Sequence, residues 1–552
     1  MAVNFSDTDF GRLAAYADSH KGRSLPPEGE RSELSLVQRL QLVYEERGES
    51  EATIDDIPAR YESAVLRLNA FRETNKGAIV SFMRRVREKF SDDRDPLRTV
   101  YYMDTVLVVT FMALLAGCRT CEDIAQYWYD YNIELQVLVP GMPGPEYMIS
   151  PDTVNAVLCL VDGETAAAFF REYFTQVLDM TNSQISCDPN MADVLDFSDC
   201  KRVLSADGQE MRGTSRKGNY NRRCKGGHVT TLFDNDSQTV LDYVVVNKKN
   251  NEDKALLKML TNVSVEGCLI SADALSSRDY LAKAIIKAGA GYLLNVKSNS
   301  NDTEELRQAT MEAFNLAHMG KARPGQSYIA PYRYVYKDPD DQWRHGRREH
   351  LIIEQIPASA VEPEVLKNTS FPDIKSVVRY TKVVVTKYTP SKSKKKKSKI
   401  KKNRNERHRI AGNYVITMST RYYISTEEFS VAGFKNVIKC ILEYWGIEAM
   451  HNSLDTALDQ DKLIMREPKH IESRAALNKM LWHVLKWVRD HSPSPTRHKF
   501  AIKRVQQRLG DVFVNFRNFT EYWLDMAANG DNAPPEEEPK RVPNFLLEKL
   551  VD

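Results

Sequence analysis

The chain has no long uninterrupted apolar run among its 552 residues. Its longest apolar stretch covers residues 100–118, and Asp104 interrupts it. The remainder is shorter than the roughly 20 residues that a membrane-spanning helix needs. The N-terminal residues also lack the basic-then-apolar pattern of a secretory signal. We therefore expect a cytoplasmic protein without a membrane span, in which residues 100–118 form a buried helix.

Cysteine is sparse and scattered, with eight residues in the whole chain. Cys118 and Cys121 form a single CxxC pair, and no second pair lies at a spacing typical of zinc sites. The pattern favours reduced, mostly buried thiols over a metal or redox site.

Charge of one sign is not in excess, because the formal net charge is only +2. Its distribution is nevertheless uneven. The basic block, residues 392–409, holds eleven Lys and Arg and one Glu, including the run Lys394, Lys395, Lys396 and Lys397. Such a block cannot build a core and is typical of a solvated loop. We expect it to contact nucleic-acid phosphates; a solubility segment or a localisation signal is the alternative.

The length of the chain predicts two to four domains. Short β-rich runs and helical runs follow one another in the order βββαβαβ after Cys187, which predicts a mixed α/β sheet. The predicted regions are a charged helical region with a DNA-end-binding role (1–95), a helical domain (96–186), the α/β region (187–300), a β-rich region with the basic block (301–425), a second helical part (426–500) and a helical tail (501–552).

Two predicted strands each deliver an aspartate where they end. Asp207 follows "VLSA", and Asp273 follows "LISA" 66 residues later. A strand-terminal aspartate is usually a turn or cap residue, and Asp273 could cap a helix that begins near Ser276. Within one sheet, however, the two carboxylates can converge although they are distant in sequence.

Glu448 is the best candidate for a third carboxylate. It lies in the apolar, aromatic stretch "ILEYWGIEAMH", where burial of a charge costs several kcal/mol unless it is paired or metal-bound. Glu443 and Asp455 are the local alternatives. Three carboxylates can hold two Mg²⁺ or Mn²⁺ ions roughly 3.5–4 Å apart, an arrangement that clamps the attacking and leaving oxygens of a phosphodiester.

Several segments resemble the motifs of one known family. They are "MDTVLVVTFMALLAGCRTCEDIAQYW", "ISPDTVNAVL", "SADGQEMRGT", "KKNNEDKALL", "DALSSRDYLAKAIIKAGAGYLLNVKSN", "HGRREH" and "YWGIEAMHNSLD". Each motif alone is weak, but their common order over about residues 101–488 is specific. The chain resembles DDE transposases of bacterial insertion sequences, in the branch that includes the H-repeat-associated proteins.

The resemblance implies an RNase H-like catalytic core with a β-rich insertion, preceded by an α-helical region. Asp207 would lie on the first strand, Asp273 after the fourth, and Glu448 on a helix beyond the insertion. These three would be the catalytic residues and the ligands of two Mg²⁺ or Mn²⁺ ions. The implied substrates are double-stranded element ends and target DNA, handled by a homodimer near the bacterial nucleoid.

Four further residues are candidates for DNA binding, each with a structural alternative. Arg212 and Arg347 lie in matched motifs and could instead pair with carboxylates. Lys297 could be a solvated lysine, and His451 a partly buried structural histidine. Trp445 is expected in the core rather than stacked on a base.

The sequence departs from the family pattern at two positions beside the carboxylates. Gln209 stands where the family has Lys, and Ala449 where it has Asn. These departures leave open a transposase-derived DNA-binding protein without activity. An RNase H-fold nuclease without strand transfer is a further alternative, which the sequence does not separate from a transposase.

Overall fold

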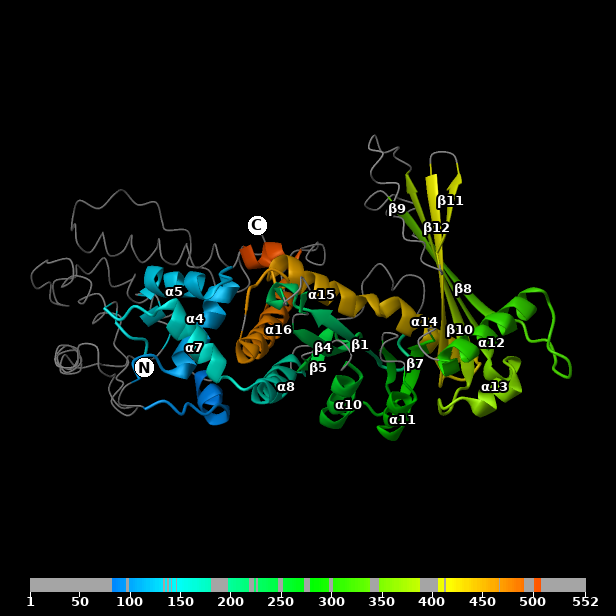
Figure 1. Cartoon of the computed structure of the whole chain (residues 1–552), viewed down its shortest axis with the longest axis horizontal. Coiled ribbons are helices and arrows are strands. Elements are labelled where there is room, and N and C mark those ends of the chain that lie inside the picture. The colour runs from blue at the N-terminus through cyan, green and yellow to red at the C-terminus, as the bar shows by residue number, and fades with distance from the viewer. Residues whose placement is uncertain are drawn as a thin grey trace, which may run out of the picture. The chain divides into compact units, whose positions relative to one another are not determined.

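A computed structural model describes residues 82–95, 99–132, 135–136, 139, 141–144, 146–179, 197–217, 223–224, 227–246, 252–272, 278–296, 301–337, 347–387, 406–411, 414–465, 467–490 and 501–507. These residues form two compact units (Figure 1). The first unit takes the described residues within 1–180, 210–227 and 450–552, and the second takes those within 181–209 and 228–449. The predicted regions 1–95 and 501–552 lie mostly outside the described residues.

The first unit is helical. Its helices are α4 (Met103–Leu115), α5 (Cys121–Asp130), α7 (Pro151–Leu160), α8 (Gly163–Asp179) and α16 (Pro468–Asp490). Helix α16 packs against α4, α7 and α8. Helix α7 begins as the sequence predicts: Ser150 Oγ accepts a hydrogen bond from the backbone N of Thr153 at 3.1 Å, and Pro151 occupies the first turn. The unit also holds the short strands β2 (Arg216–Lys217) and β3 (Arg223–Cys224).

Helix α4 confirms the buried helix predicted within residues 100–118. All of its residues except Phe111 are buried, including Asp104, which is paired with Arg87. In the part of the chain that the structure describes, no single helix is long and apolar enough to cross a membrane. Only α7 and residues 163–172, bent by 77°, reach that length and composition as a pair.

The second unit is built on a ten-stranded mixed sheet. Its core half has the strands β1 (Val203–Glu210), β4 (His228–Asp234), β5 (Thr239–Val246), β6 (Leu269–Ala272) and β7 (Gly291–Asn295), with the helices α10 (Glu252–Asn262) and α11 (Asp279–Lys287). The strand order is β5-β4-β1-β6-β7. Strands β1, β6 and β7 are parallel, whereas β4 and β5 are antiparallel to each other. The predicted order βββαβαβ and the mixed α/β class are confirmed.

The inserted half follows β7 in sequence and extends the same sheet. It contains α12 (Asn301–His318), β8 (Tyr332–Lys337), β9 (Arg347–Pro357), α13 (Pro363–Asn368), β10 (Ser376–Lys387), β11 (Glu406–Ala411) and β12 (Tyr414–Ser425). Strand β12 pairs antiparallel with β7, and the order continues β12-β10-β9-β8, with β11 beside β12. Helices α14 (Val431–Glu443) and α15 (Trp445–Ala457) then complete the unit, and α15 runs on into the first unit.

Two details of the inserted half differ from the sequence interpretation. The first 18 residues form α12 instead of irregular β structure, because Leu306, Ala309, Ala313 and Phe314 recur at helical spacing and are buried. The end of the basic block is also ordered, since residues 406–409 belong to β11 and pair with β12. The rest of the block, residues 392–405, lies outside the described part of the chain.

Helices cover both faces of the core half. Leu204 and Ala206 of β1 pack on one face with apolar residues of α10, α11 and α12. Val203 packs on the opposite face with apolar residues of α14, such as Val437 and Ile441. Because side chains alternate along a strand, the odd-numbered residues of β1 share the face that α14 covers.

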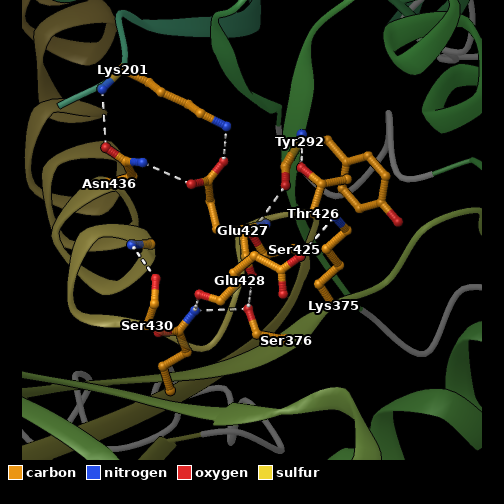
Figure 2. A network of polar contacts seen from close by, with 12 residues as sticks. Lys201, Tyr292, Lys375, Ser376, Ser425, Thr426, Glu427, Glu428, Ser430 and Asn436 are labelled. Atoms are coloured by element: carbon orange, nitrogen blue, oxygen red, sulfur yellow. Dashed lines mark hydrogen bonds and ion pairs between the residues drawn. The ribbon is translucent and has the colours of Figure 1, made fainter.

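A polar network joins the inserted half to the core half (Figure 2). Ser425, the last residue of β12, donates a hydrogen bond to the backbone O of Tyr292 on β7 at 3.2 Å. Thr426 Oγ1 accepts the backbone N–H of Tyr292 at 2.9 Å, and Ser376 Oγ of β10 donates to the backbone O of Glu427 at 2.7 Å. The end of the insertion is thereby fixed to the last core strand.

The buried carboxylate of Glu427 fixes the start of α14 in the same network (Figure 2). It accepts from Lys201 Nζ and from Asn436 Nδ2 of α14, both at 2.7 Å. Asn436 Oδ1 in turn accepts the backbone N–H of Lys201, two residues before β1, at 3.0 Å. Ser430 caps the helix by accepting the N–H of Gly433 at 3.0 Å. Helix α14 is therefore hydrogen-bonded to the segment that precedes β1.

Candidate active site

Asp207 is the fifth of the eight residues of β1 and is half-buried. The sequence interpretation placed the end of this strand at Asp207. In the structure the strand continues through Gly208 and Gln209 to Glu210. The described pairing of β1 with β6 ends at Ala206 and Ala272, while β4 borders the other side of β1. Asp207 thus directly follows the last residue of β1 that pairs with β6 among the described residues.

Strands β1 and β6 run parallel in a register that pairs Ala206 with Ala272. Asp207 follows Ala206, and Asp273 follows Ala272 in sequence. Asp273 itself lies outside the described residues. The two residues that precede the predicted metal ligands are therefore direct neighbours in the sheet.

Asp207 shares its face of β1 with Val203 and Ser205, by strand alternation. Val203 packs against α14 on this face. Ser205 Oγ accepts a hydrogen bond from Asn235 Nδ2 at 2.7 Å, and both residues are buried. Asp207 is thus on the side of the sheet where α14 and the following helix lie.

Glu448 lies in the first turn of α15 and its side chain is exposed. The expectation that it is buried is wrong. Ile447 and Met450 are buried at 0% and 1% exposure, and the rotation of about 100° per residue turns Glu448 away from them. The alternatives Glu443 and Asp455 are both less exposed than Glu448. An exposed carboxylate at this position is accessible to a cation.

The start of α15 lies against the turn between β4 and β5, and this turn contacts β1. A Cβ atom at Gly446 would lie 2.9 Å from Gln238 Nε2, 3.1 Å from the ring of Phe233 and 3.2 Å from Asn235 Oδ1. Asn235 is the residue that hydrogen-bonds Ser205, two positions before Asp207. A short chain of contacts therefore connects the helix of Glu448 with the strand of Asp207.

The inserted half adds polar side chains near Glu448 that sequence reasoning missed. Burial, and then the charges of neighbours that include Glu349 and Glu448, raise the pKa of Tyr380 on β10. Lys382, two residues later, holds Glu349 at 2.7 Å and places its Nζ 4.3 Å from the ring centroid of Trp445. Trp445 is 45% exposed, so its assignment to the core is wrong. The two-residue spacing of Tyr380 and Lys382 was the sequence pattern that could have identified these two residues.

The remaining predicted DNA-binding residues are dispersed. Arg347 begins β9, is 53% exposed and pairs with Glu349 at 3.0 Å. His451 is buried at 8% exposure, which favours its structural interpretation. Arg212 is 67% exposed, and its Nε lies 3.3 Å from Asp461 Oδ2. Lys297 and the run Lys394, Lys395, Lys396 and Lys397 lie outside the described residues.

The donor set suits a hard divalent cation. Asp207, which is half-buried, and Glu448, which is exposed, offer carboxylate oxygens, and Mg²⁺ and Mn²⁺ prefer such ligands. Within the described ranges, which exclude Asp273, no group of three or more His, Cys, Asp or Glu side chains gathers as a metal site. Burial raises the pKa of both the Cys118 and the Cys121 thiols to about 11, so both stay protonated at neutral pH.

Known proteins resemble the chain over most of its length. YncI of Escherichia coli O157:H7, named as a candidate transposase, is 23% identical over 72% of this chain and 86% of its own length. YhhI of E. coli strain K12, named as an H repeat-associated candidate transposase, is 21% identical over 71% and 87%. The solved synaptic complex of piggyBac transposase with hairpin DNA is 10% identical over 93% of this chain and 90% of that chain. Its TM-score against this chain is 0.32.

The sequence profile described as "Transposase DDE domain" matches residues 198–483. This range contains the whole sheet of the second unit, together with Asp207, Asp273 and Glu448. The resemblance inferred from the motifs is confirmed. The chain belongs to the transposase DDE domain family, and its mixed α/β core is the RNase H-like domain of that family.

Proposed function

We propose that this protein cuts DNA at the ends of a mobile element and joins the freed 3′-hydroxyl to target DNA. The observation that carries the proposal is the parallel register of Ala206 with Ala272, each followed by an aspartate. The contact of Gly446 with Asn235 supports it further, because it connects the helix of Glu448 with the same strand.

Members of this family generally depend on divalent metals. Asp207, Asp273 and Glu448 would hold two Mg²⁺ or Mn²⁺ ions. When bound, such a pair supplies a nucleophilic water and offsets the charge that develops on the phosphate oxygens. The chain's own contribution would be to position these carboxylates before the phosphodiester arrives, so that little reorganisation is needed.

Both reactions are in-line displacements at phosphorus. In cleavage, a water oxygen bonds to the phosphorus, the bond from phosphorus to the 3′-oxygen breaks, and that oxygen takes a proton. In joining, the same 3′-oxygen attacks a target phosphorus and displaces the 3′-oxygen of the target strand. One arrangement of carboxylates serves both steps, since the geometry at phosphorus is the same.

Double-stranded DNA would reach the carboxylates beside the inserted half. Arg347 of β9 and the basic block, which follows β10 in sequence and ends within β11, offer positive charge for backbone phosphates. Two element ends must be joined in one event, so we propose a homodimer with one site for each end. Such a DNA substrate would place the protein at the bacterial nucleoid.

The test is incubation of the full chain with DNA that flanks its own gene, in Mg²⁺ or Mn²⁺. End-specific nicks, followed by covalent joining to a target plasmid, are the expected products. Cuts without joined product would identify a nuclease without strand transfer. Binding without any cut would identify a DNA-binding protein that has lost activity.

A further inference from the structure

The motif that follows Asp207 forms a tightly bonded turn. The 3₁₀ turn η5 (Arg212–Thr214) begins two residues after β1. The backbone N of Met211 donates to the O of Gly227 at 2.9 Å. Thr214 Oγ1 donates to the O of Met211 and accepts the N–H of Gly227, both at 2.7 Å. The main chain is therefore held firmly just beyond the strand that carries Asp207.

The loop that follows α15 is fixed as well. Arg119 donates to the backbone O of Ala457, the last residue of α15, at 2.5 Å. Asp459 adopts a left-handed φ of +50°, and its carboxylate lies 3.4 Å from Arg119 Nε. Gln460 Oε1 accepts from Asn478 Nδ2 of α16 at 3.0 Å, and both are buried. The loop therefore has little freedom to move on its own.

These two fixed segments contact each other. Asp461 accepts the backbone N–H of Arg212 through Oδ1 at 3.3 Å, and its Oδ2 lies 3.3 Å from Arg212 Nε. A Cβ atom at Gly213 would lie only 2.2 Å from the backbone O of Leu463. Any side chain at Gly213 would separate the two main chains. We call Arg212, Gly213, Asp461 and Leu463 the clamp.

We propose that the clamp is a positioning device that sets the separation of Asp207 and Glu448; this inference rests on the proposed function. Arg212 follows Asp207 by five residues along β1 and its continuation. Asp461 lies beyond the end of α15, the helix that carries Glu448. A strand and a helix are each stiff, so a contact between their continuations constrains the carboxylates that they carry.

This role differs from the DNA contact that the sequence predicted for Arg212. The carboxylate of Asp461 already engages the guanidinium and would repel an approaching phosphate. An exposed ion pair adds at most about 1 kcal/mol to stability, so geometry rather than stability is the expected contribution. A displacement of about 1 Å at a reacting centre can cost roughly 100-fold in rate.

The experiment compares Arg212→Ala and Asp461→Ala with the matched control Lys462→Ala in the full chain. Lys462 is 77% exposed in the same loop, and its side chain pairs only with Asp459 among the described residues. Both clamp variants should lower cleavage by about 10- to 100-fold. They should also weaken Mn²⁺ binding, measured calorimetrically without DNA, by several fold. The control should change neither quantity, and Asp461→Asn, which keeps the acceptor for the N–H of Arg212, should restore part of both.

The DNA affinity decides between the clamp and a phosphate contact. The clamp predicts an unchanged slope of log affinity against log salt for Arg212→Ala. A slope flatter by about 0.9, with unchanged Mn²⁺ binding, would show a phosphate contact and overturn the clamp. Unchanged Mn²⁺ affinity in Asp461→Ala would overturn it as well. If the wild-type chain binds Mn²⁺ but does not cut its own ends, the proposed function fails, while the Mn²⁺ comparison still judges the clamp.

Discussion

The core half and the inserted half share one sheet but have different strands. The core strands are short and buried along most of their length, as in β4 and β6, where every residue is buried. The inserted strands β9 and β12 have 11 and 12 residues and are buried mainly at the end near β7. The core strands lie between helices on both faces, so they must be apolar.

This difference separates two tasks. The core half can hold carboxylates at fixed positions, because the strands and helices around them are closely packed. The inserted half tolerates charge along its length: Arg347 is exposed, and Lys382 is partly buried but paired with Glu349. We infer that cleavage chemistry belongs to the core half and phosphate contact to the inserted half, and five changes test this division.

The largest effect should come from the carboxylates. Asp207→Asn, Asp273→Asn and Glu448→Gln each remove the charge of a proposed metal ligand with little change in volume. Each should reduce cleavage by at least about a thousandfold, whereas the affinity for DNA should stay nearly unchanged. The controls are Glu443→Gln and Asp455→Asn, measured in the same nicking assay. If one of these is inactive while Glu448→Gln cuts normally, the third carboxylate has been assigned wrongly.

Removal of metal should distinguish the expected roles of the two halves without any mutation. In EDTA, cleavage should disappear, and it should return with Mg²⁺ or Mn²⁺. Binding of DNA by the inserted half should persist in the chelator, because we expect it to depend on Lys and Arg. Parallel nicking and filter-binding measurements check both statements. Full cleavage in EDTA would contradict the metal mechanism.

The basic block should affect binding of every sequence alike. Replacement of Lys394, Lys395, Lys396 and Lys397 by Ala should flatten the slope of log affinity against log salt by up to roughly 3.6. Discrimination between element ends and random DNA should barely change, since phosphate contacts do not read bases. Affinities measured at several salt concentrations provide the test. An unchanged slope would leave a solubility segment or a localisation signal as the explanation.

The two halves should also differ in their sensitivity to side-chain truncation. Leu293→Ala removes a fully buried side chain of β7 and should lower the free energy of unfolding by about 2–5 kcal/mol. Val384→Ala, in the half-exposed part of β10, should cost less than about 1 kcal/mol. Denaturant unfolding of both variants gives the comparison. Equal costs would show that the inserted half is packed as tightly as the core.

The smallest effect should come from Lys382. Its ammonium is shared between Glu349 and the ring of Trp445, so Lys382→Ala loses a partly buried ion pair and one cation–π contact of roughly 0.5–2 kcal/mol. Cleavage should fall only a few fold, with DNA affinity nearly constant. Steady-state nicking rates measure the loss. A thousandfold loss would place Lys382 among the catalytic residues. It would contradict the assignment of cleavage to the core half alone.

Local patterns predicted the elements of the core half well, because alternation and helical spacing are set by neighbours in sequence. The same rules applied to α12 would have found it, since Leu306, Ala309 and Phe314 follow helical spacing. Its polar start and the surrounding β-rich segments hid the pattern. Glu448 shows the opposite error: an apolar stretch suggested burial, although the helix turns that side chain outward.

The contacts that hold the candidate site together could not be predicted from sequence. Arg212 and Asp461 are 249 residues apart, and Ser205 and Asn235 are 30 apart. Such pairs depend on which strands become neighbours, and no local pattern specifies that. The sequence around Arg212 matched a family motif, but the partner of its side chain became evident only in the fold.

The pairing of β12 with β7 has a consequence for attempts to shorten the protein. Without the insertion, β7 would become an edge strand of almost entirely buried residues, with unpaired backbone groups open to other chains. The insertion moves the edge to β8, which is short and carries Arg333 and Lys337. A truncated core would therefore be expected to aggregate through β7, so a minimal nuclease made from this chain would need a new cover for that strand.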